Sequence, residues 1–177
     1  MNQETAISFG IFASFTWIRC EGKGSFLQSP ALKECAEMRR SQGEKHFVID
    51  LGACTGMDST FMGQLTSLAK RASKEGGSVQ IASPGEKNRR SLEDLGLDCL
   101  MEISPANADW SGKEDEIRAN LEPFQSNRLP DARERARHVL DSHKTLASTS
   151  DENAKRFETV LQVMEREAKE SSRKDSH

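Results

Sequence analysis

The sequence predicts an α/β domain, with a small and mostly parallel sheet flanked by helices, followed by a C-terminal helical extension. Two observations support this prediction. Strand-like and helix-like segments alternate as far as residue 104, and such alternation is typical of a parallel sheet covered by helices. Beyond that point the strand-like pattern stops, and a polar stretch leads into two amphipathic helical patterns.

The N-terminal segment has the period-two pattern of half-buried strands. From Ile7 to Trp17 the large apolar side chains fall on odd-numbered positions, which predicts two strands, arranged as a hairpin, within residues 6–20. The next segment contains Gly22 and Gly24, and we interpret it as a loop because glycine permits backbone angles that other residues avoid. Gly-x-Gly alone is not a nucleotide-binding fingerprint.

Helices and buried strands then alternate. Pro30 suits the first turn of a helix that ends at Gly43. The apolar run at 46–51 predicts a central buried strand, and residues 78–82 predict another. These segments supply the middle of the expected sheet.

The second helix is expected to begin at Asp58-Ser59-Thr60, because all three side chains can cap a helix N-terminus. An apolar stripe follows as far as the glycine pair at 76–77. A third, short helix is expected around residues 92–97, ended by a glycine, and residues 100–103 predict a last short strand. The predicted domain spans residues 1–104.

The remainder of the chain has a different composition. Prolines punctuate a polar stretch at 105–130, which we expect to be a linker. Thin apolar stripes predict a helical hairpin at 131–170, with a capping box of Thr149 and Glu152 starting its second helix. We expect 171–177 to be disordered. The hairpin either packs back on the domain or binds a partner.

Composition excludes several classes of function. The chain has 177 residues and a net charge of −3, with basic and acidic side chains interleaved, so we expect no nucleic-acid partner. The first residues lack a basic n-region, and the longest apolar stretch, 6–18, is too short to cross a bilayer. We therefore expect a cytoplasmic protein without a membrane partner.

Cysteines and histidines show no reactive pattern. The four cysteines are widely spaced, without a C-x-x-C pair, and are interpreted as small apolar residues in a reducing compartment. The four histidines form no pairing typical of catalysis or metal binding, so solvated surface positions are expected for them. We expect no catalytic residue, no metal and no cofactor.

An ordered set of features occupies the window from residue 47 to residue 103. An apolar strand ends in Asp, a glycine pair precedes the next strand, and Gly-Leu follows the third helix. The turn before the second helix reads Met57-Asp58-Ser59-Thr60-Phe61-Met62-Gly63. This set resembles the STAS domain family, in the form found in bacterial anti-anti-sigma factors, also called anti-sigma factor antagonists. Phe61 stands where the family pattern, Asp-Ser-Ser/Thr-Gly, has glycine.

The resemblance implies a STAS fold and a protein-binding module that regulates transcription and is not an enzyme. In the family, the serine directly after the Asp is phosphorylated by an anti-sigma factor with serine kinase activity, and phosphorylation abolishes binding. That serine is Ser59 here, and the expected partner is such an anti-sigma factor. The expected partner-binding residues are Asp58, Thr60, Phe61, Met62, Gly22 and Gly24.

The position of Ser59 fits this role on physical grounds as well. A helix N-terminus presents unpaired N–H groups and a partial positive charge, so the fold tolerates a phosphate there. The phosphate adds roughly −1.5 to −2 charges at pH 7 beside Asp58, which a docked partner would have to oppose or bury. Binding is therefore expected to be lost without a global conformational change.

Some alternatives stay open. Ser59 could be an ordinary capping residue, and Asp58 could cap the helix, orient Ser59 or meet a metal ion of the kinase. Phe61 could fill a partner's pocket, obstruct the usual docking or turn into the core. At the level of the whole protein, one alternative is a constitutive STAS scaffold or an oligomeric signalling subunit that self-associates through its C-terminal helices. Another is a small-molecule-regulated or nucleotide-binding STAS domain, for which the sequence offers no dedicated site.

Overall fold

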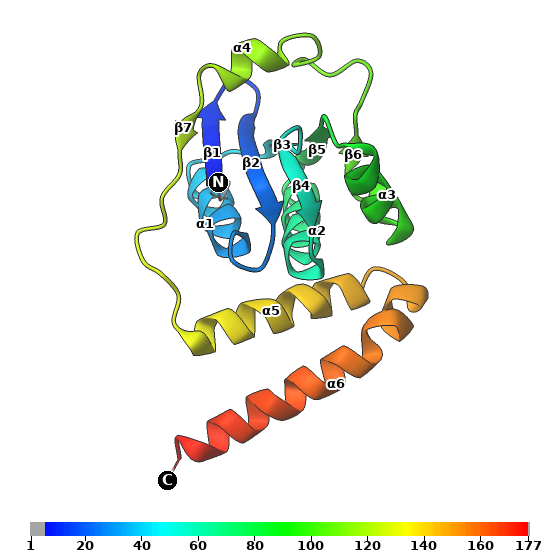
Figure 1. Cartoon of the computed structure of the whole chain (residues 1–177). Coiled ribbons are helices and arrows are strands. Elements are labelled where there is room, and N and C mark those ends of the chain that lie inside the picture. Colours follow the sequence, from blue (N-terminus) through cyan, green and yellow to red (C-terminus); the bar gives the residue numbers. More distant parts are fainter. Residues whose placement is uncertain (1–5, 177) are drawn as a thin grey trace.

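The structure is a computed structural model of the chain, and it describes residues 6–176. Its elements alternate as predicted in the first 104 residues and become helical at the C-terminus (Figure 1). In chain order they are β1 (Ala6–Ile11), β2 (Thr16–Gly24), α1 (Ser29–Ser41), β3 (His46–Asp50), β4 (Cys54–Met57), α2 (Ser59–Lys74), β5 (Ser78–Ala82), α3 (Glu86–Asp94), the 3-10 turn η1 (Leu97–Cys99), β6 (Glu102–Ile103), α4 (Glu114–Arg118), β7 (Glu122–Pro123), α5 (Ala132–Ala147) and α6 (Asp151–Lys174).

The sheet has the strand order β6-β5-β3-β2-β1-β7, and β4 pairs with the far end of β2. The pairs β2–β3, β3–β5 and β5–β6 are parallel, whereas β1 is antiparallel to both β2 and β7. The helices α1, α2 and α3 connect these strands. The predicted α/β fold, with a mostly parallel sheet and a C-terminal helical extension, is confirmed.

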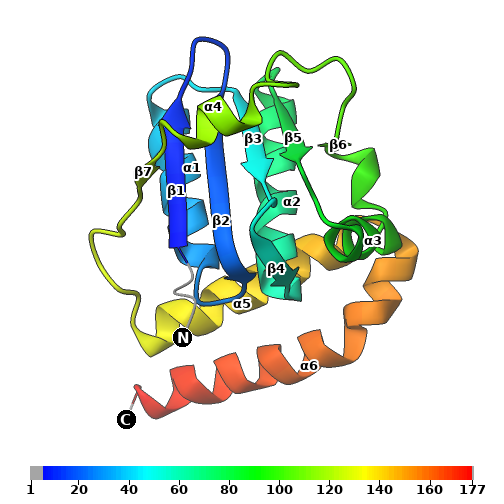
Figure 2. The same ribbon diagram turned by 45° about the horizontal axis from the view of Figure 1, so that its top comes forward.

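Both faces of the central strands are covered, which explains why β3 is a continuous apolar run. Phe47 and Ile49 point into the main core beneath α1 and α2, while Val48 points to the opposite face. That opposite face is covered by the segment that follows β6, as Figure 2 shows, with α4 in front of the sheet and α1 and α2 behind it. Trp17 and Trp110 meet there edge to face, with their ring centroids 5.5 Å apart.

The expectation of a linker at 105–130 is therefore wrong for its first part. Residues 114–118 form α4, and β7 pairs with β1 at Ser8 and Phe9. Trp110 and Ile117 are buried in the second core. The sequence did not reveal this because the apolar side chains are too few and too far apart to produce a helical or strand-like period.

A second correction concerns the glycine loop. Gly22 and Gly24 lie inside β2, which extends to residue 24, because β4 pairs with this end of the strand. The register shifts between residues 22 and 23, and Gly22 has a φ of 81°, so this bulge uses a backbone angle that glycine permits. β4 itself was not predicted, because four residues containing a threonine and a glycine show no strand pattern.

The C-terminal hairpin packs against the domain (Figure 1). Leu146 of α5 and Phe157 of α6 join the main core, so the interpretation of a hairpin packed back on the domain is the one observed. The cap of α6 is Ser150, one residue after the predicted Thr149, and α6 continues to Lys174, so the expected disorder is wrong for residues 171–174. None of the helices within residues 6–176 combines the length and the hydropathy needed to cross a membrane.

Candidate functional site

The site is built around the turn between β4 and α2. Asp58 is the N-cap of α2, with extended backbone angles, and its Oδ1 accepts a hydrogen bond from the backbone N–H of Phe61 at 2.9 Å. Its Oδ2 accepts a second one from the backbone N–H of Phe26 at 2.7 Å. Asp58 thus holds the first turn of α2 and the loop between β2 and α1 together, which is the capping role among the alternatives stated for it.

Ser59 is the first residue of α2 and is half-buried. Its Oγ lies 2.8 Å from Nε2 of His143, a residue of α5 that is 84 positions later in the chain. Nδ1 of the same ring lies 2.7 Å from the carbonyl oxygen of Val139, which can only accept a hydrogen bond. Nδ1 therefore carries a proton, and in the neutral ring Nε2 accepts the hydrogen bond that the Ser59 hydroxyl donates.

His143 is held rigidly in this contact. Its side chain is buried, with 6% of its surface exposed, and its ring meets that of Phe157 edge to face. A matching contact joins the same helix to α1, because Nε2 of His138 lies 2.6 Å from Oγ of Ser29. The prediction that these histidines are solvated is wrong for both of them, although it holds for His46, and His177 lies outside the described residues.

These two contacts could not be predicted from the sequence because they depend on where the hairpin packs. His138 and His143 are five residues apart, which is not a helical metal-binding spacing, and each finds its own serine at a different helix N-terminus. No group of three or more His, Cys, Asp or Glu side chains in residues 6–176 is arranged to hold a metal ion.

The structure brings the predicted partner-binding residues together around the start of α2, but it buries most of them. The side chains of Thr60 and Met62 are 4% and 9% exposed, and Phe61 is fully buried. Gly22 and Gly24 are buried in β2. Phe61 thus takes the inward position, where a Cβ added at Gly24 would lie 3.0 Å from its ring. Asp58 and Ser59 keep partial exposure.

Two exposed apolar side chains adjoin the site and were not predicted. Phe26 and Leu27 in the loop between β2 and α1 are 45% and 65% exposed. The loop is tied to the start of α2 by the bond from Phe26 N–H to Asp58. A signal was present in the sequence, since two large apolar residues follow the Gly-x-Gly segment, but a short loop gives no periodicity from which to judge their exposure.

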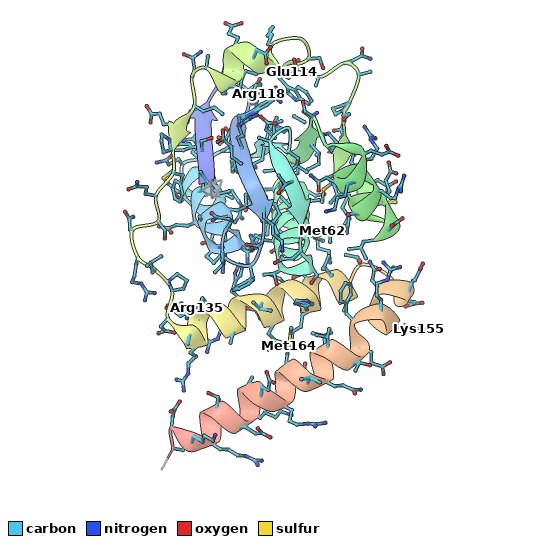
Figure 3. All side chains as sticks on the ribbon, in the orientation of Figure 1. Met62, Glu114, Arg118, Arg135, Lys155 and Met164 are labelled. Atoms are coloured by element: carbon cyan, nitrogen blue, oxygen red, sulfur yellow. The ribbon has the colours of Figure 1, made fainter. Side chains whose placement is uncertain are left out.

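The C-terminal end of β3 carries a buried charge cluster, which contacts Trp17 on the face of the sheet opposite to α1 and α2. Asp50 is fully buried, and its carboxylate accepts hydrogen bonds from Arg19 at 2.7 Å, from Arg118 at 2.9 and 3.1 Å, and from Trp17 at 3.2 Å. Burial acts to raise the pKa of Asp50, but the hydrogen bonds from Arg118, the Gly52 N–H and Arg19 outweigh it and hold this pKa below its usual value. The ion pair between Asp50 and Arg118 therefore holds α4 against the sheet; Arg118 is labelled in Figure 3.

Comparisons with known proteins agree with this architecture. The model of the STAS domain family matches residues 8–109, which is more than half of the chain. An anti-sigma factor antagonist from Mycobacterium paratuberculosis superposes with a TM-score of 0.54 at 19% identity, covering 68% of this chain and 97% of that one. No curated protein matches in sequence.

The cell fate determinant SpoIIAA of Bacillus, an anti-sigma factor antagonist, is also similar. Its phosphorylated form superposes with a TM-score of 0.50 at 16% identity, and covers 64% of this chain and 99% of that one. Its unphosphorylated form gives a TM-score of 0.50 at 15% identity, with 64% and 98% covered. The family model ends before α5 and α6, so the hairpin is an addition to the matched domain. The chain belongs to the STAS domain family.

Proposed function

We propose that this protein is an anti-sigma factor antagonist whose binding to its partner is controlled by phosphorylation of Ser59. The observation that supports this proposal is the place of Ser59, directly after the N-cap Asp58 at the first position of α2 in a STAS domain. SpoIIAA, a neighbour in structure, exists in phosphorylated and unphosphorylated forms. The proposed partner is an anti-sigma factor with serine kinase activity.

The local electrostatics favour such a switch. The first turn of α2 contains no acidic residue, so the partial positive charge of the helix N-terminus is met only by the cap Asp58. Both oxygens of that carboxylate are fixed by backbone N–H groups, so its charge cannot swing away from a phosphate on Ser59. Phosphorylation would place two adjacent negative groups where a partner docks, and the cost of burying them opposes binding.

The neighbouring surface supplies the apolar contact that a protein interface needs. Phe26 and Leu27 project from the loop that Asp58 anchors, so they and Ser59 share one rigid unit. Aromatic side chains at the centre of an interface commonly contribute most of the binding energy. Phe61 is fully buried and packs under the turn, so its side chain does not form part of the binding surface.

The test uses the full chain and an anti-sigma kinase encoded next to its gene. Incubation with ATP is expected to phosphorylate wild type and Ser41→Ala, a control at the exposed end of α1, but not Ser59→Ala. In calorimetry, Ser59→Ala should bind the partner and Ser59→Asp should bind at least about tenfold more weakly. Equal binding of the two variants would show that Ser59 is not the switch.

Assembly through the C-terminal helices is a separate prediction. The face of α5 that carries His143 is used within the chain, which leaves α6 as the available surface, where Val163 is 46% exposed. Light scattering of the full chain at two concentrations tests it. A mass of one chain at both would remove the oligomeric subunit as an alternative function.

A further inference from the structure

The C-terminal hairpin covers the proposed switch residue. α5 packs against α2 from Ser59 to Lys70, and both views place it directly against the end of the domain at which α2 begins (Figures 1 and 2). Met62, one turn into α2, lies on the side that faces α5 in Figure 3. The hydroxyl that a kinase would have to reach is already hydrogen-bonded to His143 of α5.

The two helices approach too closely for anything to pass between them. A Cβ added at Gly63 of α2 would lie only 2.4 Å from the carbonyl oxygen of Ser142, so the backbones meet where α2 has no side chain. Ser142 is itself buried, with 4% of its surface exposed. Since His143 Nε2 is at hydrogen-bond distance from Ser59 Oγ, a phosphoryl group has no room between these two atoms while α5 is in place.

The buried contacts that attach the hairpin are made by neutral groups, and the charged donors Lys70 and Arg156 lie at its exposed edge. Leu146 is fully buried in the main core, and the side-chain amide of Asn153 donates to the carbonyl oxygen of Leu95 at 2.8 Å. Among the residues that the structure describes, no ion pair joins α5 or α6 to residues 6–104. Lifting the hairpin therefore exposes apolar surface and neutral polar groups but strands no buried charge.

We propose that the α5–α6 hairpin is an internal competitor for the partner surface around Ser59, so that a kinase or an anti-sigma factor reaches this residue only after the hairpin has lifted. That the competing protein is an anti-sigma factor with kinase activity rests on the proposed function. That the hairpin covers Ser59 does not depend on it. Because coupling between equilibria is reciprocal, a phosphate on Ser59 also disfavours docking of the hairpin. The docked hairpin slows phosphorylation because the kinase reaches the hydroxyl only in the fraction of molecules whose hairpin has lifted.

The first experiment tests, without any partner protein, whether the hairpin covers Ser59. Ser59→Cys, in a Cys99→Ser background that removes the exposed native thiol, places a reporter under α5 for reaction with a maleimide. Ser142→Arg, which cannot fit against Gly63, is expected to raise the labelling rate at least about tenfold. Ser171→Arg makes the same change at an exposed site of α6, and should leave the rate within about twofold of the parent.

Amide hydrogen exchange distinguishes a lifted hairpin from an unfolded domain. β3 and β5 should keep their protection in Ser142→Arg, while α5 and α6 lose theirs. If the central strands also lose protection, Gly63→Ala replaces Ser142→Arg as the test variant. It adds a single methyl group at the same contact with Ser142 and raises the helix propensity of α2. The proposal is overturned if the variant that keeps its strands labels no faster than Ser171→Arg.

The kinase then separates this proposal from the function on which it rests. With Ser59 restored, Ser142→Arg should be phosphorylated at least about tenfold faster than wild type. Equal rates for the two would refute competition but leave the phosphorylation switch intact. Fast thiol labelling in Ser142→Arg without phosphorylation of any variant would refute the switch and leave the covering of residue 59 standing.

Discussion

Two segments outside the predicted domain attach to it in opposite ways. The segment 105–123 covers one face of the sheet and is fastened by the buried ion pair of Asp50 with Arg118 and by the packing of Trp17 on Trp110. The α5–α6 hairpin covers the N-terminal end of α2 and is held by buried apolar side chains and by hydrogen bonds between uncharged groups, with two exposed hydrogen bonds from Lys70 and Arg156 at its edge.

This difference in charge predicts which of the two segments can detach from the folded domain. Removing Arg118 would leave the buried carboxylate of Asp50 paired with Arg19 but without two of its hydrogen bonds, which is costly, so the segment 105–123 is expected to stay in place whenever the domain is folded. Removing His143 from Ser59 leaves two neutral groups that water can satisfy. The following four experiments test this contrast.

The largest effect is expected at the buried ion pair. Asp50→Asn removes the buried carboxylate that pairs with both Arg19 and Arg118, and should lower the free energy of unfolding by about 3–5 kcal/mol in urea titrations followed by tryptophan fluorescence. Asp115→Asn is the matched control, since it removes a fully exposed carboxylate that pairs with the same Arg118. We expect little change from the control, and equal effects of the two would contradict a fastening role for Asp50.

A smaller and more local effect is expected from Leu146→Ala. The side chain projects from α5 into the main core and is fully buried, so its truncation should weaken hairpin docking by about 2–5 kcal/mol. Exchange should rise in α5 and α6 while β3 stays protected. Val163→Ala, an exposed apolar position of α6, serves as control. Loss of protection throughout the chain in Leu146→Ala would mean that the hairpin is part of one cooperative unit.

The two attachments should also respond to acid in different pH windows. Burial lowers the pKa of His138 below its ordinary value of 6.5, and Lys33 of α1 lowers it further, against the opposing charges of Asp141 and Glu37. A histidine with a lowered pKa stabilises docking fully above 6.5, and this contribution is lost as the pH falls from that value through the lowered pKa.

The pKa of Asp50 is also lowered, so the contribution of this carboxylate is complete above its ordinary value of 3.8 and is lost only below it. Acidification should therefore loosen α5 and α6 first and the tryptophan-lined face later. Hydrogen exchange at several pH values, corrected for the intrinsic rate, measures the first step and tryptophan fluorescence the second. The early step should disappear in His138→Gln, and a single transition in the wild type would contradict two separate attachments.

The smallest effect is expected from Lys70→Ala. Nζ of Lys70 donates to Oγ of Ser148 at 2.7 Å on the exposed edge between α2 and α5. Exposed polar contacts of this kind contribute little, so labelling at residue 59 should change by less than about threefold. A change as large as that of Ser142→Arg would show that the docking energy lies at the rim of the contact.

The sequence predicted the sheet and the helix that carries the site because their signals are local. The strand 78–82 was placed with its observed bounds, and the start of α2 followed from the capping residues at 58–60. The same reasoning could not find β4 or β7, because strands of four and two residues are defined by their partners and not by an apolar period of their own.

The candidate site was predicted only in part for a related reason. Ser59 and Asp58 were found because their types and order carry a capping signal and a family pattern. The role of His143 was not predicted, because its contact with Ser59 depends on how α5 packs. A histidine in a polar helix has no local sequence feature that indicates whether it is buried. Long-range packing also decided that Phe61 faces inward.

The fit of Phe61 against Gly24 has a consequence for how this sequence can vary. The aromatic ring occupies the volume that a side chain at position 24 would need, since an added Cβ would lie 3.0 Å from the ring carbon Cδ1. The two positions therefore share one fixed volume, on adjacent strand and helix. Relatives with a larger residue at the strand position should carry a smaller one on the helix, and a protein of this family with both large would have to push α2 off its sheet.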